Sequence, residues 1–146
     1  MHTRLLMCGY SHHHEPFVTG AEEGLNSYLF RWQTEGEAEA LIDGRMRRVR
    51  TGDLLLYRPN DAYRLLVGFG NSQQARERVS SSDYFLACRG HWIDEWWQRR
   101  QRPRRINIGI EERLLSIWRM LVQEKRRIGQ ENGELCDYLL RLLCLT

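Results

Sequence analysis

The sequence has no hydrophobic run long enough to cross a membrane. Its longest apolar stretch, residues 139–145, is interrupted by Arg141 and falls far short of the about 20 residues that a membrane-spanning helix needs. The first residues also lack the apolar stretch and the small-residue cleavage site of a secretory signal. We therefore expect a soluble, cytoplasmic protein with no membrane partner.

The sequence also has no closely spaced cysteines and very few lysines. The four cysteines are far apart in the sequence, so they form no CxxC pair and no zinc-ligand spacing, and we expect reduced thiols: Cys8, Cys88, Cys136 and Cys144. Of the 22 basic lysine and arginine residues, only Lys125 is a lysine. We interpret this bias as a property of the genome rather than of the chemistry.

Length and composition describe one ordinary globular domain. The chain has 146 residues, of which 42% are hydrophobic and 28% are charged. The net charge of +3 is unevenly distributed, because residues 99–127 contain ten basic and three acidic residues and so carry +7. Such a segment is most often a solvated surface, but it could also meet phosphate or an acidic partner.

A β-hairpin is predicted around Asp43-Gly44, because this dipeptide provides the positive-φ pair of a two-residue type I′ turn. A two-residue loop fixes the register and places Ala40 opposite Arg47. One face of the hairpin then carries small and aliphatic residues together with one arginine: Ala38, Ala40, Ile42, Val49 and Arg47.

Further strands and three helices are predicted on either side of this hairpin. Tyr28, Phe30 and Trp32 share one face of an aromatic strand, and Pro59 ends the apolar strand that follows the hairpin. Additional strands are expected at residues 63–67, 83–88 and 103–110. Helices are expected at residues 91–100, from residue 111 to Gly129, and from residue 133 to the end. The last helix stops without a cap, so we expect the chain to be part of a longer protein.

The segment GDLLLYRPNDAY after the hairpin resembles the conserved segment of a cupin, a small jelly-roll barrel. The order that follows is an aromatic strand (DYFLACRG), a tryptophan-rich helix (HWIDEWWQ), a strand and two helices. Over residues 8–146, this order is similar to the sensory domain of AraC-family transcription regulators. The resemblance implies a mainly β fold: a cupin-like jelly-roll barrel followed by two C-terminal α-helices. Residues 1–25 would form an N-terminal arm and first strand, residues 26–110 the barrel, and residues 111–146 a dimerisation segment.

The resemblance also implies a function. In that family the barrel binds a small effector, often a sugar, the terminal helices form a homodimer, and a separate C-terminal helix-turn-helix domain, absent here, binds DNA. The expected ligand-binding residues lie on the aromatic strands, after the proline turn, on the arm and in the hairpin: Tyr28, Trp32, Ser82, Tyr84, Tyr63, Leu65, Phe17 and Arg47. The expected dimerisation residues form an apolar stripe on the last helix: Leu135, Tyr138, Leu139, Leu142 and Leu143.

The predicted hairpin contains no histidine, whereas metal-binding cupins place histidines there and after the proline turn. Tyr63 and Arg64 occupy the positions after that turn. We therefore expect no metal, no cofactor and no catalytic residue. Two alternatives stay open: a stand-alone cupin enzyme acting on a sugar or small acid, and a cupin used only for dimerisation whose barrel is filled by side chains.

Other chemically notable residues favour structural roles. The consecutive histidines His12, His13 and His14 alternate in direction along an extended arm, so they fit a polar arm better than a metal site. Cys88 and His91 lie on either side of a glycine, and a buried structural thiol is the simpler interpretation.

Arg47 carries the most specific hypothesis about the ligand. Its partner across the hairpin is the small Ala40, which leaves room for a guanidinium group to enter the barrel. A buried arginine must be paired. An internal acid would satisfy Arg47, and so would reaching the rim of the barrel or pairing with a carboxylate, phosphate or polar sugar edge of a ligand. Pairing with a ligand predicts effectors with an acidic group, such as uronic acids or sugar phosphates.

Overall fold

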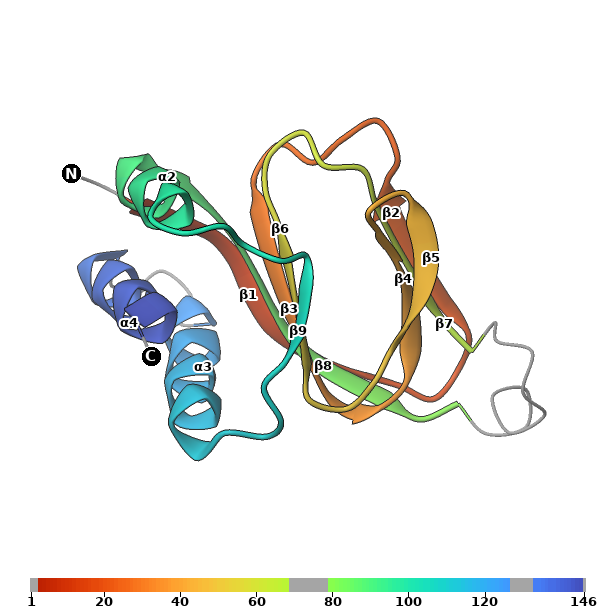
Figure 1. Ribbon diagram of the computed structural model, residues 1–146. Helices are drawn as coiled ribbons and strands as arrows, with labels where there is room; N and C mark the ends of the chain where they lie inside the picture. Colours follow the sequence, from red (N-terminus) through yellow and green to blue (C-terminus); the bar gives the residue numbers. More distant parts are fainter. Residues whose placement is uncertain (1–2, 69–78, 127–132, 146) are drawn as a thin grey trace.

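The computed structural model describes residues 3–68, 79–126 and 133–145. Two antiparallel sheets face each other, and three helices cover the outer side of the larger sheet (Figure 1). The larger sheet contains, in spatial order, β1 (Thr3–His13), β8 (Ser81–Gly90), β3 (Tyr28–Gly36), β6 (Asp53–Tyr57) and β9 (Arg105–Asn107). The smaller sheet contains β2 (Phe17–Ala21), β7 (Tyr63–Val67), β4 (Ala38–Ile42) and β5 (Arg45–Val49). The helices are α2 (His91–Gln98), α3 (Glu112–Lys125) and α4 (Gly133–Leu145).

The predicted fold class is confirmed: a mainly β, cupin-like jelly roll followed by two C-terminal helices. Among the described residues, no helix is both long and apolar enough to span a bilayer. Some boundaries differ from the expectation. The arm region forms the long strand β1 and the short strand β2, and the strand expected at residues 103–110 is reduced to β9.

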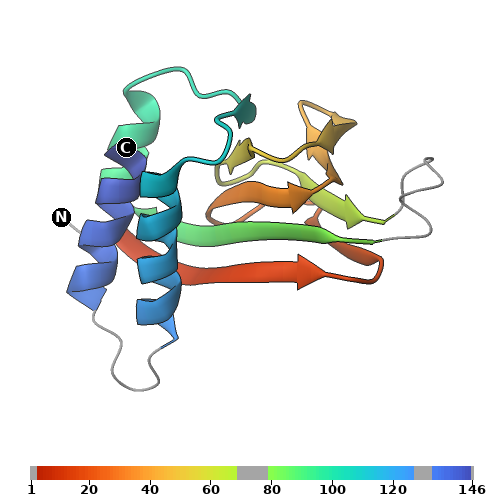
Figure 2. The ribbon, with the colours of Figure 1, turned by 90° about the horizontal axis from the view of Figure 1, so that it is seen from below.

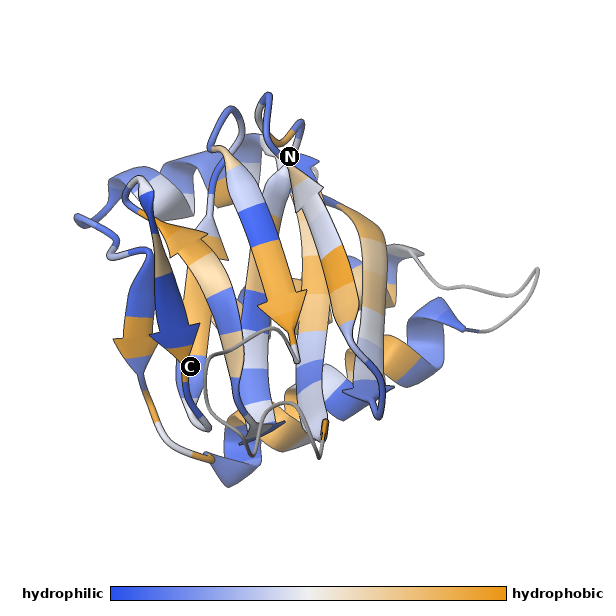
Figure 3. Ribbon diagram, turned by 90° about the vertical axis from the view of Figure 1, so that its right-hand side faces the viewer, coloured by the Kyte–Doolittle hydropathy of each residue, from blue (hydrophilic) through white to orange (hydrophobic). Residues whose placement is uncertain are grey.

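The hairpin of β4 and β5 has the predicted register. Ala40 lies opposite Arg47, and Ala38 lies opposite Val49. Asp43 and Gly44 both have positive φ, at 51° and 83°, as a type I′ turn requires. In Figure 3 the smaller sheet faces the viewer, and hydrophilic and hydrophobic segments follow one another along its strands, as expected for a sheet with one buried face.

Two separate hydrophobic cores lie on the two faces of the larger sheet. The barrel core lies between the sheets and comprises Leu29, Ala38, Ala40, Ile42, Val49, Leu55, Tyr57, Tyr63, Leu65, Val67 and Ala87. The helix-side core lies between the larger sheet and the helices. It includes Tyr28, Phe30, Trp32, Tyr84, Leu86, Cys88 and the apolar faces of all three helices. Strand β3 is buried along six consecutive residues because both of its faces are covered.

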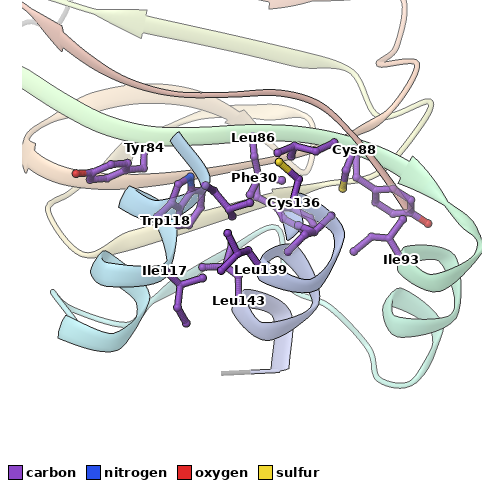
Figure 4. Packing of buried hydrophobic residues seen from close by; sticks show 14 of the residues in the cluster. Phe30, Tyr84, Leu86, Cys88, Ile93, Ile117, Trp118, Cys136, Leu139 and Leu143 are labelled. Atoms are coloured by element: carbon purple, nitrogen blue, oxygen red, sulfur yellow. The ribbon is translucent and has the colours of Figure 1, made fainter. Parts of the chain in front are cut away.

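Helices α3 and α4 lie side by side across one end of the larger sheet (Figure 2). Apolar side chains of both helices, including Ile117, Leu139 and Leu143, pack towards the sheet (Figure 4). Leu121 and Leu140 are completely buried. Helix α3 begins after Glu111, whose carboxylate accepts a hydrogen bond from the Leu114 backbone N–H at 3.0 Å. The apolar face that the periodicity predicts for each of these two segments therefore packs against the larger sheet of the barrel.

All four cysteines are free thiols. Burial raises the pKa of both Cys8 and Cys144 to about 12, and it raises the pKa of Cys88 well above its ordinary value. Cys136 is also buried.

Because only the thiolate is nucleophilic, we expect alkylation by iodoacetamide at pH 8 to be at least about a hundredfold slower in the native protein than in urea. Mass spectrometry of quenched samples would measure the rate at each cysteine. A cysteine that reacts equally fast in both states would contradict the buried placement of that thiol.

Candidate ligand-binding site

Three of the predicted ligand-binding residues point away from the barrel. Tyr28, Trp32 and Tyr84 belong to the helix-side core. The Tyr28 hydroxyl donates a hydrogen bond to Asp94 of α2 at 2.8 Å, and the Trp32 indole N–H donates to the Gly109 carbonyl at 3.1 Å. The expectation that these residues line the barrel is wrong because the helices need an aromatic surface to pack against.

Ser82 is completely buried near the end of the larger sheet. Its hydroxyl contacts the Nδ1 atom of His12 on β1 and donates to a carboxylate oxygen of Glu35 at 3.4 Å. This predicted ligand-binding residue therefore has partners within the protein. His12 and His14 are exposed, and the half-buried His13 ring stacks on Phe17 with 4.3 Å between ring centroids.

Arg47 does not enter the barrel. Its side chain is exposed on β5, an edge strand of the smaller sheet, and its Nε donates to the Ile42 carbonyl at 3.4 Å. The predicted pairing with Ala40 is correct, but close to an edge turn the long side chain can reach solvent instead of the core. The placement of Arg47 inside the barrel is therefore corrected.

The remaining predicted residues do lie in the barrel. Tyr63 and Leu65 of β7 belong to the barrel core with exposed fractions of 4% and 0%, and Phe17 of β2 packs against it. The Tyr63 ring contacts the Tyr57 ring edge to face, with 4.9 Å between centroids. Strand β2 pairs with β7, with Phe17 opposite Val67 and Ala21 opposite Tyr63, so Phe17 and Tyr63 lie at opposite ends of this strand pair.

An internal ion pair lies among these residues. The Nη1 atom of Arg31 on β3 donates to Oδ2 of Asp83 on β8 at 2.7 Å, and both side chains are buried. The guanidinium group of Arg31 also lies over the Phe85 ring at 4.9 Å. Burial raises the pKa of Asp83, while the charge of Arg31 opposes this shift. The barrel thus contains two buried charges, and each is stabilised by the other.

Four buried polar atoms around this pair have no hydrogen-bond partner among the described residues. They are Arg31 Nε, Asp83 Oδ1, Tyr63 Oη and His13 Nε2. Electrostatic interactions show that these groups lie close together. Burial raises the pKa of Tyr63, and the Arg31 guanidinium, which interacts with the Tyr63 hydroxyl without a well-aligned hydrogen bond, opposes this shift. Burial lowers the pKa of His13, and the charge of Asp83 opposes this shift. An unsatisfied buried polar atom costs about 1–3 kcal/mol, so this set is a candidate binding site rather than an ordinary core.

Arg31 and Asp83 were not among the predicted ligand-binding residues. Alternation along β3 places Arg31 on the face opposite Phe30 and Trp32, and the aromatic face was expected to be the barrel face. Once the aromatic face packs against helices, Arg31 must point inward. Among the described residues, no group of three or more His, Cys, Asp or Glu side chains could hold a metal ion.

Sequence comparison finds no family model and no curated protein that matches this chain. Solved structures do match. The structure of ToxT from Vibrio cholerae with a bound unsaturated fatty acid has a TM-score of 0.55 and 10% identity, covering 94% of this chain and 51% of that chain. A second ToxT structure has a TM-score of 0.53 and 9% identity, covering 94% of this chain and 54% of that chain.

The chain therefore spans about half the length of the ToxT chains that it matches. The ethanolamine utilization protein EutQ of Salmonella typhimurium is a partial match, with a TM-score of 0.37 and 16% identity over 55% of this chain. ToxT is an AraC-family regulator. At these identities the likeness to ToxT establishes the fold alone.

Proposed function

We propose that this chain is the ligand-sensing and dimerisation domain of an AraC-type transcription regulator in the cytoplasm. It binds a small molecule in the barrel and controls a DNA-binding helix-turn-helix domain that lies outside this chain. The fold shared with ToxT over 94% of the chain supports this proposal. ToxT has been solved with a bound unsaturated fatty acid and with a bound methylnaphthalenyl butenoic acid, so that protein binds small molecules.

The observation that carries the barrel site is the set of unsatisfied atoms around Arg31 and Asp83. Arg31 Nε is a donor, Asp83 Oδ1 is an acceptor, and the Tyr63 hydroxyl can act as either. A sugar hydroxyl both donates and accepts, so adjacent hydroxyls of one sugar satisfy this set. The charge of Arg31 is already balanced by Asp83, so neutral sugars fit here better than the acidic sugars suggested by Arg47.

Side chains fill this part of the barrel, because Tyr57 and Tyr63 are 1% and 4% exposed. A ligand that reaches the ion pair must therefore displace at least one side chain, and its binding changes the packing of the barrel. This property suits a sensor, in which binding shifts the balance between conformations. Two competing proposals are a stand-alone cupin enzyme, which turnover of a bound sugar would favour, and a filled barrel that serves dimerisation only.

A pair of tyrosine variants tests the barrel site. Tyr63→Phe removes a buried hydroxyl that interacts with the Arg31 guanidinium but forms no well-aligned hydrogen bond. We therefore expect the free protein to keep its stability and to lose at least tenfold in sugar affinity. Tyr57→Phe is the matched control, since its hydroxyl donates to the Leu41 carbonyl at 2.8 Å. Losing that bond costs about 1 kcal/mol, or ~3 °C in Tm, and should leave sugar affinity unchanged.

The measurement is a thermal-shift screen of neutral sugars and sugar acids, followed by calorimetry on any ligand that stabilises the protein. If no sugar stabilises the wild-type protein, or if both tyrosine variants bind sugar as the wild type does, the proposed barrel site is wrong. A lower Tm of Tyr63→Phe would show that its hydroxyl has a partner in the free protein.

The homodimer is proposed to use the exposed side of α4. Tyr138 and Leu142 are 59% and 49% exposed, and Leu135 is 40% exposed. Leu139 and Leu143, which were expected in the same interface, belong to the helix-side core with exposed fractions of 8% and 6%. The predicted dimerisation stripe is therefore divided, and only its outer half is available to a second copy.

A further inference from the structure

A cavity lies outside the barrel, on the helix side of the larger sheet. Its volume is about 530 Å³, which lies within the range of small-molecule sites. Its apolar wall includes Phe30 of β3, Leu56 of β6, Trp118 of α3 and Leu143 of α4. Figure 4 shows Phe30, Trp118 and Leu143 converging from three different elements.

Three arginines from the segment between α2 and β9 also line this cavity. They are Arg99, Arg100 and Arg102, and the lining contains no aspartate or glutamate. None of the three forms an ion pair with a carboxylate among the described residues, whereas the nearby Arg104 pairs with Asp61 at 2.7 Å. The positive charge that the sequence concentrates in residues 99–127 is thus left unbalanced at this cavity.

Arg102 is held in place rather than freely solvated. Its guanidinium group stacks over the Trp96 ring at 3.8 Å from the centroid, and Nη2 donates to the Trp96 carbonyl at 2.5 Å. Its Nε atom is buried without a hydrogen-bond partner among the described residues. Burial and the neighbouring Arg100 lower the pKa of Arg102, as expected for a cation that lacks a counter-charge.

The wall around Arg102 is also fixed. The Trp96 indole N–H donates to the Cys144 carbonyl at 3.2 Å and so joins α2 to the end of α4. A rigid cation beside an apolar cavity is complementary to a molecule with an anionic head and an apolar body. A free inorganic anion would leave the apolar wall uncovered, and a neutral apolar molecule would leave the charge of Arg102 without a counter-charge.

We infer that this cavity binds an amphipathic carboxylate, with the apolar body against Phe30, Leu56 and Trp118 and the carboxylate against Arg102. The site is distinct from the barrel site, because the larger sheet separates the two. It does not depend on the proposed sugar binding.

Calorimetry with three probes tests the inference. Decanoate, used below its micelle-forming concentration, supplies both parts of the ligand, decanol supplies the body alone, and acetate supplies the head alone. We expect decanoate to bind at least tenfold more tightly than decanol, and acetate to show no measurable binding. If decanoate does not bind, or binds no better than decanol, the inference is overturned.

Three variants test whether decanoate binds in this cavity. Arg102→Gln should weaken decanoate at least tenfold and leave decanol unchanged. Arg105→Gln is the matched control, because Arg105 is exposed on β9 and does not line the cavity. Leu54→Trp, which fills the cavity from β6, should weaken both decanoate and decanol. Equal decanoate binding by the two arginine variants would overturn the inference.

Two further outcomes remain decisive. If Arg102→Gln is too unstable to measure, the double variant Arg99→Gln, Arg100→Gln should weaken decanoate severalfold, and unchanged binding would count against the site. If Tyr63→Phe weakens decanoate while Arg102→Gln does not, the amphiphile binds in the barrel. That result would overturn this inference and leave the barrel proposal intact.

Discussion

Replacing Asp83 with asparagine is expected to lower the free energy of unfolding by about 3–5 kcal/mol, because it leaves the buried guanidinium of Arg31 without a counter-charge. Urea unfolding followed by circular dichroism would measure the change. The size of this effect follows from burial, since the side chains of Arg31 and Asp83 are 8% and 0% exposed.

Two controls separate this pair from ordinary ion pairs. Asp61→Asn breaks the ion pair between Arg104 and Asp61, whose side chains are 22% and 19% exposed. This change should lower the free energy of unfolding by about 1 kcal/mol or less. The double variant Arg31→Met, Asp83→Leu removes both charges and should recover most of the loss. Equal effects of Asp83→Asn and Asp61→Asn would contradict the buried placement of the internal pair.

Changing Leu139 and Leu143 together to arginine is expected to unfold the helical layer rather than to produce a folded monomer. Both side chains are buried in the helix-side core, where even replacement by alanine costs about 2–5 kcal/mol at each position. We expect loss of cooperative thermal unfolding and aggregation, because the aromatic face of the larger sheet becomes exposed. Retention of a native Tm would contradict this placement of α4.

The exposed residues Tyr138 and Leu142 provide the comparison with the buried Leu139 and Leu143. Tyr138→Arg, Leu142→Arg changes exposed positions on the same helix, so the fold should persist while the proposed homodimer dissociates into monomers. Val18→Arg, at a 50% exposed apolar position on β2, should change neither the Tm nor the oligomeric state. Light scattering measures the mass of each variant. A wild-type protein that is already monomeric at micromolar concentrations would refute the homodimer.

The hairpin could be predicted to the residue because its signal is local. Asp43-Gly44 specifies the turn, the turn specifies the register, and the register places Ala40 opposite Arg47. The two terminal helices could also be predicted, since their apolar positions recur with helical spacing. Which of their apolar residues are buried and which stay exposed could not be predicted. Periodicity identifies an apolar face but not how much of that face a neighbouring layer covers.

The ligand site could be predicted only in part for a similar reason. Alternation shows that Phe30 and Trp32 share a face and that Arg31 lies on the other, but it does not show which face points into the barrel. Tyr63 and Leu65 do lie in the barrel core, because they are on a strand that no helix covers, and their role in ligand binding stays a prediction. The pairing of Arg31 with Asp83 depends on contacts between residues 52 positions apart, which no local pattern specifies.

Strand β8 belongs to both cores, and this has a mechanical consequence. Asp83 points into the barrel and the next residue, Tyr84, points to the helices, where its ring lies 6.1 Å from that of Trp118. Neighbouring strands hold β8 on both sides, so its backbone cannot adjust to a displaced Asp83 without carrying Tyr84 along. A ligand that displaces Asp83 in the barrel is therefore expected to shift Tyr84 and its contact with Trp118 on the opposite face of the sheet.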